Sequence, residues 1–205
     1  HRLSEIAARI GRSATALGRP LDRLIGMGLV RRETPFGEPE RGGKRSLYKI
    51  ADPFLRFWFR VVAPRRSALV AGTAASRRAA LERLWPALVA ETFEELCRAR
   101  GPASGALARV GSWGPAARWW QGTAPEWDLV ARDLDADRVL VGEVRASAMT
   151  SAEDLRRTCE RLAARALPPA VTATEIVRAL FVVRAPRPRP KTGPVHVVAL
   201  ADLLR

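Results

Sequence analysis

Apolar residues recur at helical spacing over the first 28 positions of the chain. Ser4 is a suitable N-cap for a first short helix, and Gly11 is a suitable end for it. Ser13 can cap a second helix that ends at Gly28. The apolar faces of the two helices consist of Ile6, Ala7 and Ile10, and of Leu17, Leu21, Leu24 and Ile25. We therefore expect two helices joined by a tight turn.

Two short runs typical of strands follow the second helix. They occupy residues 29–33 and 45–50, and a polar stretch rich in glycine and proline separates them. Two strands around a basic loop, placed after two such helices, are the elements of a winged helix-turn-helix. We therefore predict an N-terminal winged-helix module over residues 1–50.

Residues 51–62 concentrate aromatic side chains at helical spacing. We expect a helix that ends near Pro64, within a linker and connector over residues 51–76. A stripe of Phe and Trp at this spacing is typical of packing between domains, and a ligand site is the less common alternative.

Residues 77–205 predict a second, larger domain that combines helices and strands. A long helix is expected over residues 77–100, with Pro86 as a break or a new start, and another helix over residues 151–166. The strand candidates are residues 106–113, 127–131, 139–145, 179–183 and 195–200. The expected order is αβββαβ with an extra strand, in the α/β (α+β) class. A Pro/Arg-rich stretch at residues 184–191 predicts an extended surface loop, with phosphate contact as the less common alternative.

Length and apolar content agree with a globular protein, since 47% of the 205 residues are hydrophobic. No apolar run approaches the roughly 20 residues that span a bilayer, and the N-terminus lacks the order of a secretory signal. We therefore expect a cytoplasmic protein without a membrane partner. Because the sequence begins at His1 and enters a helix at once, we also expect it to be a fragment. Cys97 and Cys159 have no spacing typical of a disulfide framework or a zinc site.

The strong positive charge changes this interpretation. The formal net charge is +14, and an anionic partner is favoured because clustered cations exchange condensed counterions for phosphate contacts. Lysine occurs only at positions 44, 49 and 191, so the charge is almost entirely arginine. The alternative explanation is a biased genome base composition. Nucleic acid, DNA rather than RNA, is the first candidate partner.

The predicted winged helix would carry the nucleic-acid contacts. In such modules the second helix enters the major groove, and wing residues contact the backbone. Gly18 and Pro20 lie inside this expected helix, where proline costs about 3 kcal/mol. The alternative function of such a module is protein–protein contact. The candidate nucleic-acid-binding residues are Arg12, Arg19 and Arg23 on the helices and Arg41, Lys44 and Arg45 on the wing.

Acidic residues on two neighbouring predicted strands are the sharper signal. Asp128 begins one strand, and Glu143 and Arg145, two positions apart, share a face of the next. Two carboxylates that converge in this way can bind a divalent metal such as Mg²⁺, which lowers the pKa of a bound water. The alternative is that both acids pair with Arg145 or neighbouring arginines in a solvated cluster.

Asp128 followed by Glu143-Val144-Arg145 resembles the PD-(D/E)XK restriction-endonuclease-like superfamily. The whole chain more specifically resembles the C-terminal region of archaeal-type P-loop ATPases, in segments 51–60, 93–96, 128–131 and 142–143. The resemblance implies a winged helix before a nuclease-like domain, with Glu94, Asp128 and Glu143 as metal-binding acids. It also implies catalytic work for these acids and for position 145. There the sequence departs from the pattern, because Arg145 replaces lysine and a guanidinium stays protonated.

These observations lead to a ranked set of hypotheses. The first is a nucleic-acid-binding C-terminal region of an ATPase-type protein, with Mg²⁺-dependent phosphodiester hydrolysis if the site is active. The second is a catalytically inactive interaction or regulatory module of an ATPase domain or partner protein. A transcription factor ranks last, since it leaves the acidic strands unexplained. No GxxxxGK[ST] motif occurs, so the chain alone is not expected to bind ATP through a P-loop.

Overall fold

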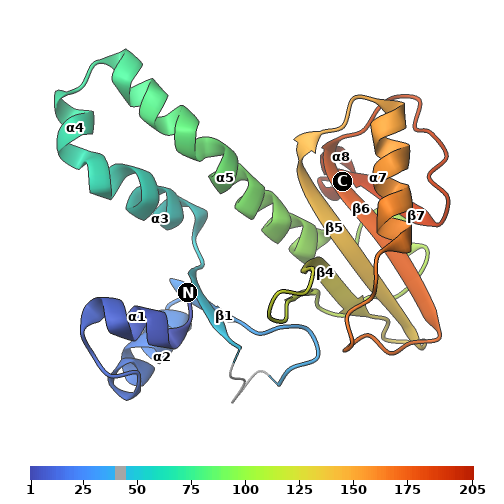
Figure 1. Cartoon of the computed structure of the whole chain (residues 1–205), viewed down its shortest axis with the longest axis horizontal. Coiled ribbons are helices and arrows are strands. Elements are labelled where there is room, and N and C mark those ends of the chain that lie inside the picture. Colours follow the sequence, from blue (N-terminus) through green and yellow to red (C-terminus); the bar gives the residue numbers. More distant parts are fainter. Residues whose placement is uncertain (40–44) are drawn as a thin grey trace. The chain divides into compact units, whose positions relative to one another are not determined.

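A computed structural model describes residues 1–39 and 45–205 of the chain (Figure 1). Its contacts divide the protein into two compact units. The first comprises residues 1–34 and 38–89, and the second comprises residues 35–37 and 90–205. The long helix α5, Ala74–Arg100, contributes its first part to one unit and its last part to the other.

Two helices and a two-stranded sheet begin the first unit. They are α1 (Leu3–Ile10), the 3₁₀ turn η1 (Thr15–Leu17), α2 (Gly18–Gly26), β1 (Val30–Glu33) and β2 (Leu47–Ile50). Strands β1 and β2 pair antiparallel. Ala7, Leu17 and Leu21 form a small buried core, against which Val30 and Tyr48 pack. The helices and strands expected over residues 1–50 are therefore present, with shifted boundaries.

The starts of both helices differ from the sequence prediction. Ser4 lies inside α1, whose N-cap is Arg2, and the Glu5 carboxylate accepts a hydrogen bond of 3.2 Å from the Arg2 amide. Ser13 precedes Ala14, the N-cap of the 3₁₀ turn, and its hydroxyl oxygen accepts from the Ala16 amide at 3.2 Å. Because α2 begins at Gly18, Pro20 lies in its first turn, where the missing N–H has no helical partner to lose. The prediction that Pro20 destabilises this helix from within its interior was therefore wrong.

A series of short helical segments follows β2. It contains α3 (Pro53–Phe57), the π-helical turn η2 (Trp58–Val62), the 3₁₀ turn η3 (Ala63–Arg65) and α4 (Arg66–Ala71). The carboxylate of Asp52 accepts a hydrogen bond of 2.9 Å from the Leu55 amide, and Pro53 occupies the first helical position. Helical structure continues past Pro64 to Ala71, beyond the end that the sequence predicted.

The sequence prediction of a break at Pro86 was also wrong, since α5 runs through it. Proline removes one backbone hydrogen bond and costs about 3 kcal/mol in a helix interior. Burial of Leu88, Phe93 and Cys97 on the following turns offsets this cost.

A five-stranded mixed sheet forms the centre of the second unit. Its order is β3 (Ala117–Trp119), β4 (Trp127–Arg132), β5 (Arg138–Ala148), β6 (Glu175–Arg184) and β7 (Val195–Ala199). The pairs β3–β4 and β4–β5 are antiparallel, whereas β5–β6 and β6–β7 are parallel. The protein therefore has a mixed α/β fold.

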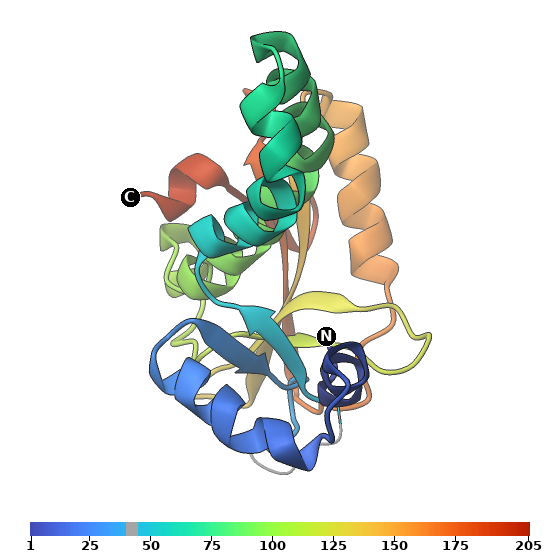
Figure 2. The same cartoon turned by 90° about the vertical axis from the view of Figure 1, so that its left-hand side faces the viewer.

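Helices cover both faces of this sheet, as Figure 2 shows. Helix α7 (Ala152–Ala164) buries Leu155, Cys159 and Leu162 against one face. The other face packs against the end of α5, the short helix α6 (Gly105–Ala108) and α8 (Leu200–Leu203). Phe93, Leu107 and Leu203 are the buried contacts there. The strands are apolar on both faces because helices cover both.

The prediction of a strand at residues 106–113 is wrong. The chain there forms α6, with Ser104 in extended conformation at its N-cap and Leu107 fully buried. The large apolar residues Leu107, Val110 and Trp113 are three positions apart, which is not the alternation that a strand needs. The first described strand of the second unit is β3, and Trp113 forms an isolated bridge to Asp133.

Within residues 1–39 and 45–205, no helix combines the length and the apolar character that crossing a bilayer requires.

Candidate functional site

The hairpin of β4 and β5 brings the two sequence-predicted acids of the sheet together. Leu129 lies opposite Gly142, so the same register places Asp128 opposite Glu143. The Asp128 carboxylate accepts a hydrogen bond of 2.8 Å from the Val144 amide. Asp128 is thereby fixed to the neighbouring strand at the start of β4.

Burial of Asp128 changes its acid–base behaviour. The pKa of Asp128 is raised above its usual value, mainly because burial penalises the charged carboxylate. The hydrogen bond from the Val144 amide and the charges of Arg118 and Arg98 oppose this rise, whereas the charge of Glu143 adds to it. Asp128 is therefore protonated more readily than an exposed aspartate.

Glu143 lies between two guanidinium groups. It forms an ion pair with Arg145, and its Oε2 lies 3.0 Å from Nη1 of Arg165. The side chains of Glu143 and Arg165 are only 14% and 22% exposed, so solvent screens their ion pair weakly, whereas Arg145 is half exposed. Both carboxylate oxygens of Glu143 are thus engaged by arginine.

Arg165 is the site residue that the sequence prediction missed. Its guanidinium lies 4.6 Å from the centre of the Trp127 ring and also donates to the carbonyl oxygen of Glu126. Trp127 Nε1 donates at 3.2 Å to the carbonyl oxygen of Ala166, which anchors the chain beside Arg165. Arg165 follows α7 and belongs to no motif, so only the folded chain places it beside Glu143.

Glu94 lies on α5 and is connected to β4 through Arg98. Nη1 of Arg98 is 3.8 Å from Glu94 Oε2 and donates to the Asp128 carbonyl oxygen at 3.0 Å. Cys97, which precedes Arg98 on α5, is fully buried, and burial raises the pKa of its thiol to about 12. Glu94 and Asp128 both contribute to this rise, while Arg98 opposes it. The three predicted acids therefore lie in one region of the second unit.

The arrangement of these groups does not fit a bound divalent metal. Among the described residues, no three His, Cys, Asp or Glu side chains are grouped so that they could hold a metal ion. Mg²⁺ is usually held by one or two carboxylates and several waters at about 2.1 Å, so those carboxylates need free oxygens. Here two arginines engage Glu143, an amide engages Asp128, and Arg145 occupies the position of the expected lysine.

The predicted nucleic-acid-binding residues fall into two groups. Arg12, Arg19 and Arg23 are exposed, and their side chains make no hydrogen bond or ion pair with any described residue. Arg45, by contrast, forms an ion pair with Glu38. Arg41 and Lys44 lie outside the described residues. The available cations named here thus lie on α2 and in the turn between α1 and η1.

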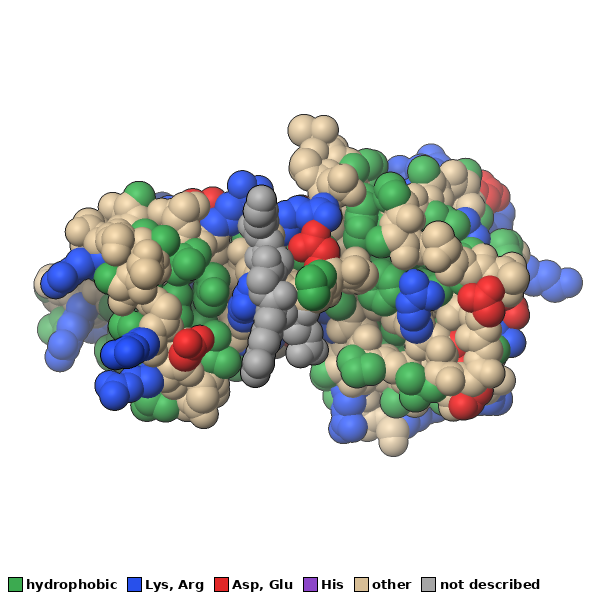
Figure 3. All heavy atoms as spheres, turned by 90° about the horizontal axis from the view of Figure 1, so that it is seen from below, with side chains coloured by type: hydrophobic (Ala, Val, Ile, Leu, Met, Phe, Trp, Pro, Cys, Tyr) green, Lys and Arg blue, Asp and Glu red, His purple; other side chains and the backbone are tan. Residues whose placement is uncertain are grey.

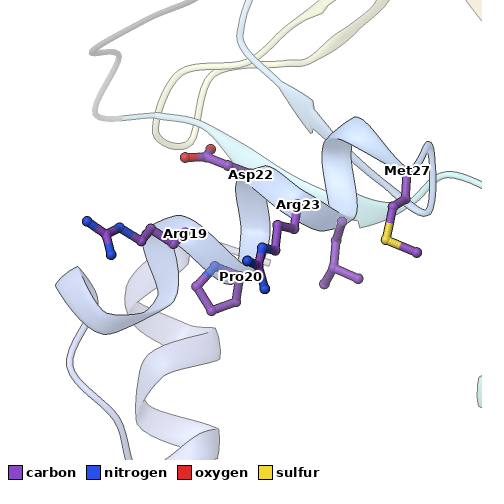
Figure 4. A pocket seen from close by; sticks show the side chains of 6 residues that line it. Arg19, Pro20, Asp22, Arg23 and Met27 are labelled. Atoms are coloured by element: carbon purple, nitrogen blue, oxygen red, sulfur yellow. The ribbon is translucent and has the colours of Figure 1, made fainter.

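Helix α2 presents its arginines around a shallow hollow of about 650 Å³. Figure 4 shows the side chains of Arg19 and Arg23 extending from the same helix, with Pro20 between them and Met27 at its end. Met27 is 68% exposed, which is unusual for a large apolar side chain. The space-filling view in Figure 3 shows basic side chains spread over both units, interspersed with apolar surface.

On strands β1 and β2 the basic side chains are already paired. Glu33 lies 3.0 Å from Arg31 and 3.2 Å from Lys49, and Arg32 donates at 2.8 Å to the Ser46 hydroxyl. The contrast with α2 indicates that the helix, rather than the strands, has cations available for a ligand.

Comparison with known proteins gives one family match. A family described as archaeal and bacterial proteins of unknown function matches residues 58–157, which is just under half of the chain. The matched segment begins at Trp58 and includes Glu94, Asp128 and Glu143. Searches of curated proteins and of solved structures gave no match. The likeness to archaeal and bacterial proteins is thus confirmed, and an association with ATPases stays a prediction.

Proposed function

We propose that this chain is the nucleic-acid-binding C-terminal region of an ATPase-type protein, whose winged helix contacts duplex DNA. Its second unit has a nuclease-like fold in this proposal. That unit does not hydrolyse phosphodiesters, because arginines engage the Glu143 carboxylate that would hold the metal.

One observation carries the proposal. Arg19 and Arg23 are one helical turn apart on α2, both are exposed, and neither has a partner among the described residues. In a helix-turn-helix this second helix is the one that enters the major groove. With Pro20 in its first turn, α2 is a regular helix that can be inserted as a unit.

Phosphate contacts give the proposal a measurable signature. Each phosphate neutralised by an arginine releases condensed counterions, so the slope of log K against log salt changes by about 0.9 per contact. Loss of two such contacts lowers affinity about tenfold or more at moderate salt.

The test is fluorescence anisotropy with a labelled duplex and the full chain over a range of salt concentrations. Replacement of Arg19 and Arg23 by Gln is expected to weaken binding about tenfold and to reduce the salt slope by about two. The matched control replaces Arg83 and Arg100, which are exposed on α5 and unpaired among the described residues. Equal losses in both double variants would reject the role of α2.

Hydrolysis is tested separately with Mg²⁺ and Mn²⁺ on DNA and RNA. We expect no cleavage above the level of an Asp128→Ala variant. Metal-dependent cleavage by the wild-type chain that Asp128→Ala abolishes would show that the acids rearrange into an active site.

An exposed aromatic surface supports a second candidate function, that of a protein-interaction module. Phe54 and Phe59 are 64% and 55% exposed, and the Phe54 and Trp58 ring centroids lie 6.4 Å apart. Trp58 and Val70, which is 73% exposed, also line one hollow, and exposed apolar side chains gathered in this way mark binding sites. This function is favoured if the chain fails to bind nucleic acid and a Trp58→Ala variant loses capture of an ATPase partner.

A further inference from the structure

The carboxyl ends of three parallel strands meet at one edge of the sheet in the second unit. Ala148 of β5 lies beside Arg184 of β6, and Val182 of β6 lies beside Ala199 of β7. Figure 1 shows β5 and β6 running side by side toward this edge. In open α/β sheets, ligands bind beyond the carboxyl ends of the strands. The edge is therefore a place to look for a second binding site.

Two hollows that share Thr150 lie at this edge. The first, of about 470 Å³, is lined by Arg184, Arg187 and Arg189 together with apolar residues that include Pro186 and Ala199. The second, of about 430 Å³, is lined by Arg157, Arg161 and residues 147–150. Arginines from β6, from the loop after it and from α7 thus line two neighbouring hollows.

The acids in this region are already paired. Asp154 lies 2.6 Å from Arg157, and Asp202 lies 2.5 Å from Arg189. Arg184 and Arg187 are exposed, and neither side chain has a hydrogen bond or ion pair within the described part of the chain. Arg161 contacts a neutral group, the Thr158 hydroxyl at 3.3 Å. The hollows therefore keep an excess of positive charge.

Arg189 holds the loop in place instead of serving as a free cation. It donates to the Val197 carbonyl oxygen at 3.1 Å as well as to Asp202, which ties the loop to β7 and α8. Prolines at positions 186, 188 and 190 restrict the same loop further. A loop fixed in this way presents Arg187 beside Arg184 with little ordering cost when a ligand binds.

We propose that these hollows bind phosphate groups of a nucleic-acid strand through Arg184 and Arg187, with Arg161 contributing from α7. The planar guanidinium fork matches phosphate oxygens and forms paired hydrogen bonds with them. The apolar wall at Pro186 and Ala199 suits the sugar next to a phosphate. The site lies on different elements from α2, so it goes beyond the proposed function and does not depend on the α2 contacts.

The experiment is arginine modification by phenylglyoxal on the full chain, read by mass spectrometry at each arginine. The probes are a single-stranded oligothymidylate, a DNA duplex, ADP and inorganic phosphate. We expect the oligonucleotides to protect Arg184 and Arg187, and ADP and phosphate to leave them reactive. Protection by ADP or phosphate would confirm a phosphate site but assign it to a free anion instead of a strand. If no probe protects either residue, the proposal is overturned.

Substitution gives the second arm. Replacement of Arg184 and Arg187 by Gln is expected to weaken oligonucleotide binding about tenfold, while the Arg83 and Arg100 control falls by less than about twofold. An effect equal to that of the control would overturn the site. The same modification experiment also reports on Arg19 and Arg23. If the duplex does not protect these two arginines, the α2 proposal fails, and the result at Arg184 and Arg187 is judged separately.

Discussion

The arginines of α2 and the arginines around Glu143 carry the same group in opposite surroundings. Arg19 and Arg23 are exposed and unpaired among the described residues. Arg165 is 22% exposed, lies on the Trp127 ring and is paired with Glu143. A guanidinium that is paired with a carboxylate and packed on an aromatic ring stabilises the folded protein, whereas a solvated guanidinium is available to bind an external anion. A net charge of +14 therefore overstates how many cations can bind a ligand.

The largest expected effect comes from breaking the Glu143 contacts. Glu143→Ala leaves Arg165 part-buried without its carboxylate, and such a loss costs about 2 kcal/mol. Urea unfolding monitored by circular dichroism is the measurement, and duplex affinity should stay within about twofold of wild type. A Glu153→Ala variant, which removes an exposed ion pair on α7, is the control and should lose less than about 0.5 kcal/mol. Equal losses in the two variants would contradict a special role for Glu143.

Replacing the α2 arginines should give the reverse pattern. The Arg19→Gln and Arg23→Gln double variant is expected to lose about tenfold in duplex affinity, equivalent to about 1.4 kcal/mol. Its free energy of unfolding should change by less than about 0.5 kcal/mol, since neither side chain contacts the core. Anisotropy and urea unfolding on the same preparation separate the two quantities. If this double variant were destabilised without losing duplex affinity, the arginines of α2 would not differ from those around Glu143.

The pH dependence of stability sharpens the comparison within the second unit. The pKa of Asp128 is raised, mainly by burial, so the folded state binds this proton more tightly than the unfolded state. Stability contributed by Asp128 is therefore lost as pH rises from its unfolded pKa through its folded pKa. Asp128→Asn is expected to be more stable than wild type near pH 7, and the difference should shrink as the pH falls toward about 3.9. The Asn side chain can still accept from the Val144 amide.

Asp202 is the matched control because its pKa shifts in the other direction. Burial alone would raise the pKa of Asp202, but hydrogen bonds from Arg189 and the Ala199 amide lower it overall. Its contribution is present above the unfolded pKa and lost as pH falls through the folded pKa. Asp202→Asn should thus be less stable than wild type near pH 7, with the difference disappearing in acid. Urea unfolding of both variants across this range checks the signs, and equal signs would contradict the assignment.

Sequence periodicity predicted secondary-structure elements better than it predicted which side chains would pair. The strands that carry Asp128 and Glu143 were found because their apolar residues and the polar turn between them are local signals. One partner of Glu143, Arg145, was named as the alternative to a metal. The second partner, Arg165, was not found, since it lies 22 residues further along and meets Glu143 only after α7 has packed on the sheet. The prediction of a strand over residues 106–113 was wrong for a different reason. Leu107, Val110 and Trp113 are three positions apart, a spacing closer to a helical turn than to the alternation of a strand.

Pro20 offers the smallest expected effect and the closest test of how α2 begins. A proline in a helix interior costs about 3 kcal/mol, so Pro20→Ala would stabilise the protein by that order if α2 extended back to Ser13. With α2 beginning at Gly18, the amide at position 20 has no intrahelical acceptor, and the variant should change the free energy of unfolding by less than about 0.5 kcal/mol. Pro86→Ala, in the interior of α5, is the matched control and should be clearly stabilising. Urea unfolding of both variants is the measurement. A large gain for Pro20→Ala would show that the helix start is misplaced and that Arg19 does not lie in the first turn.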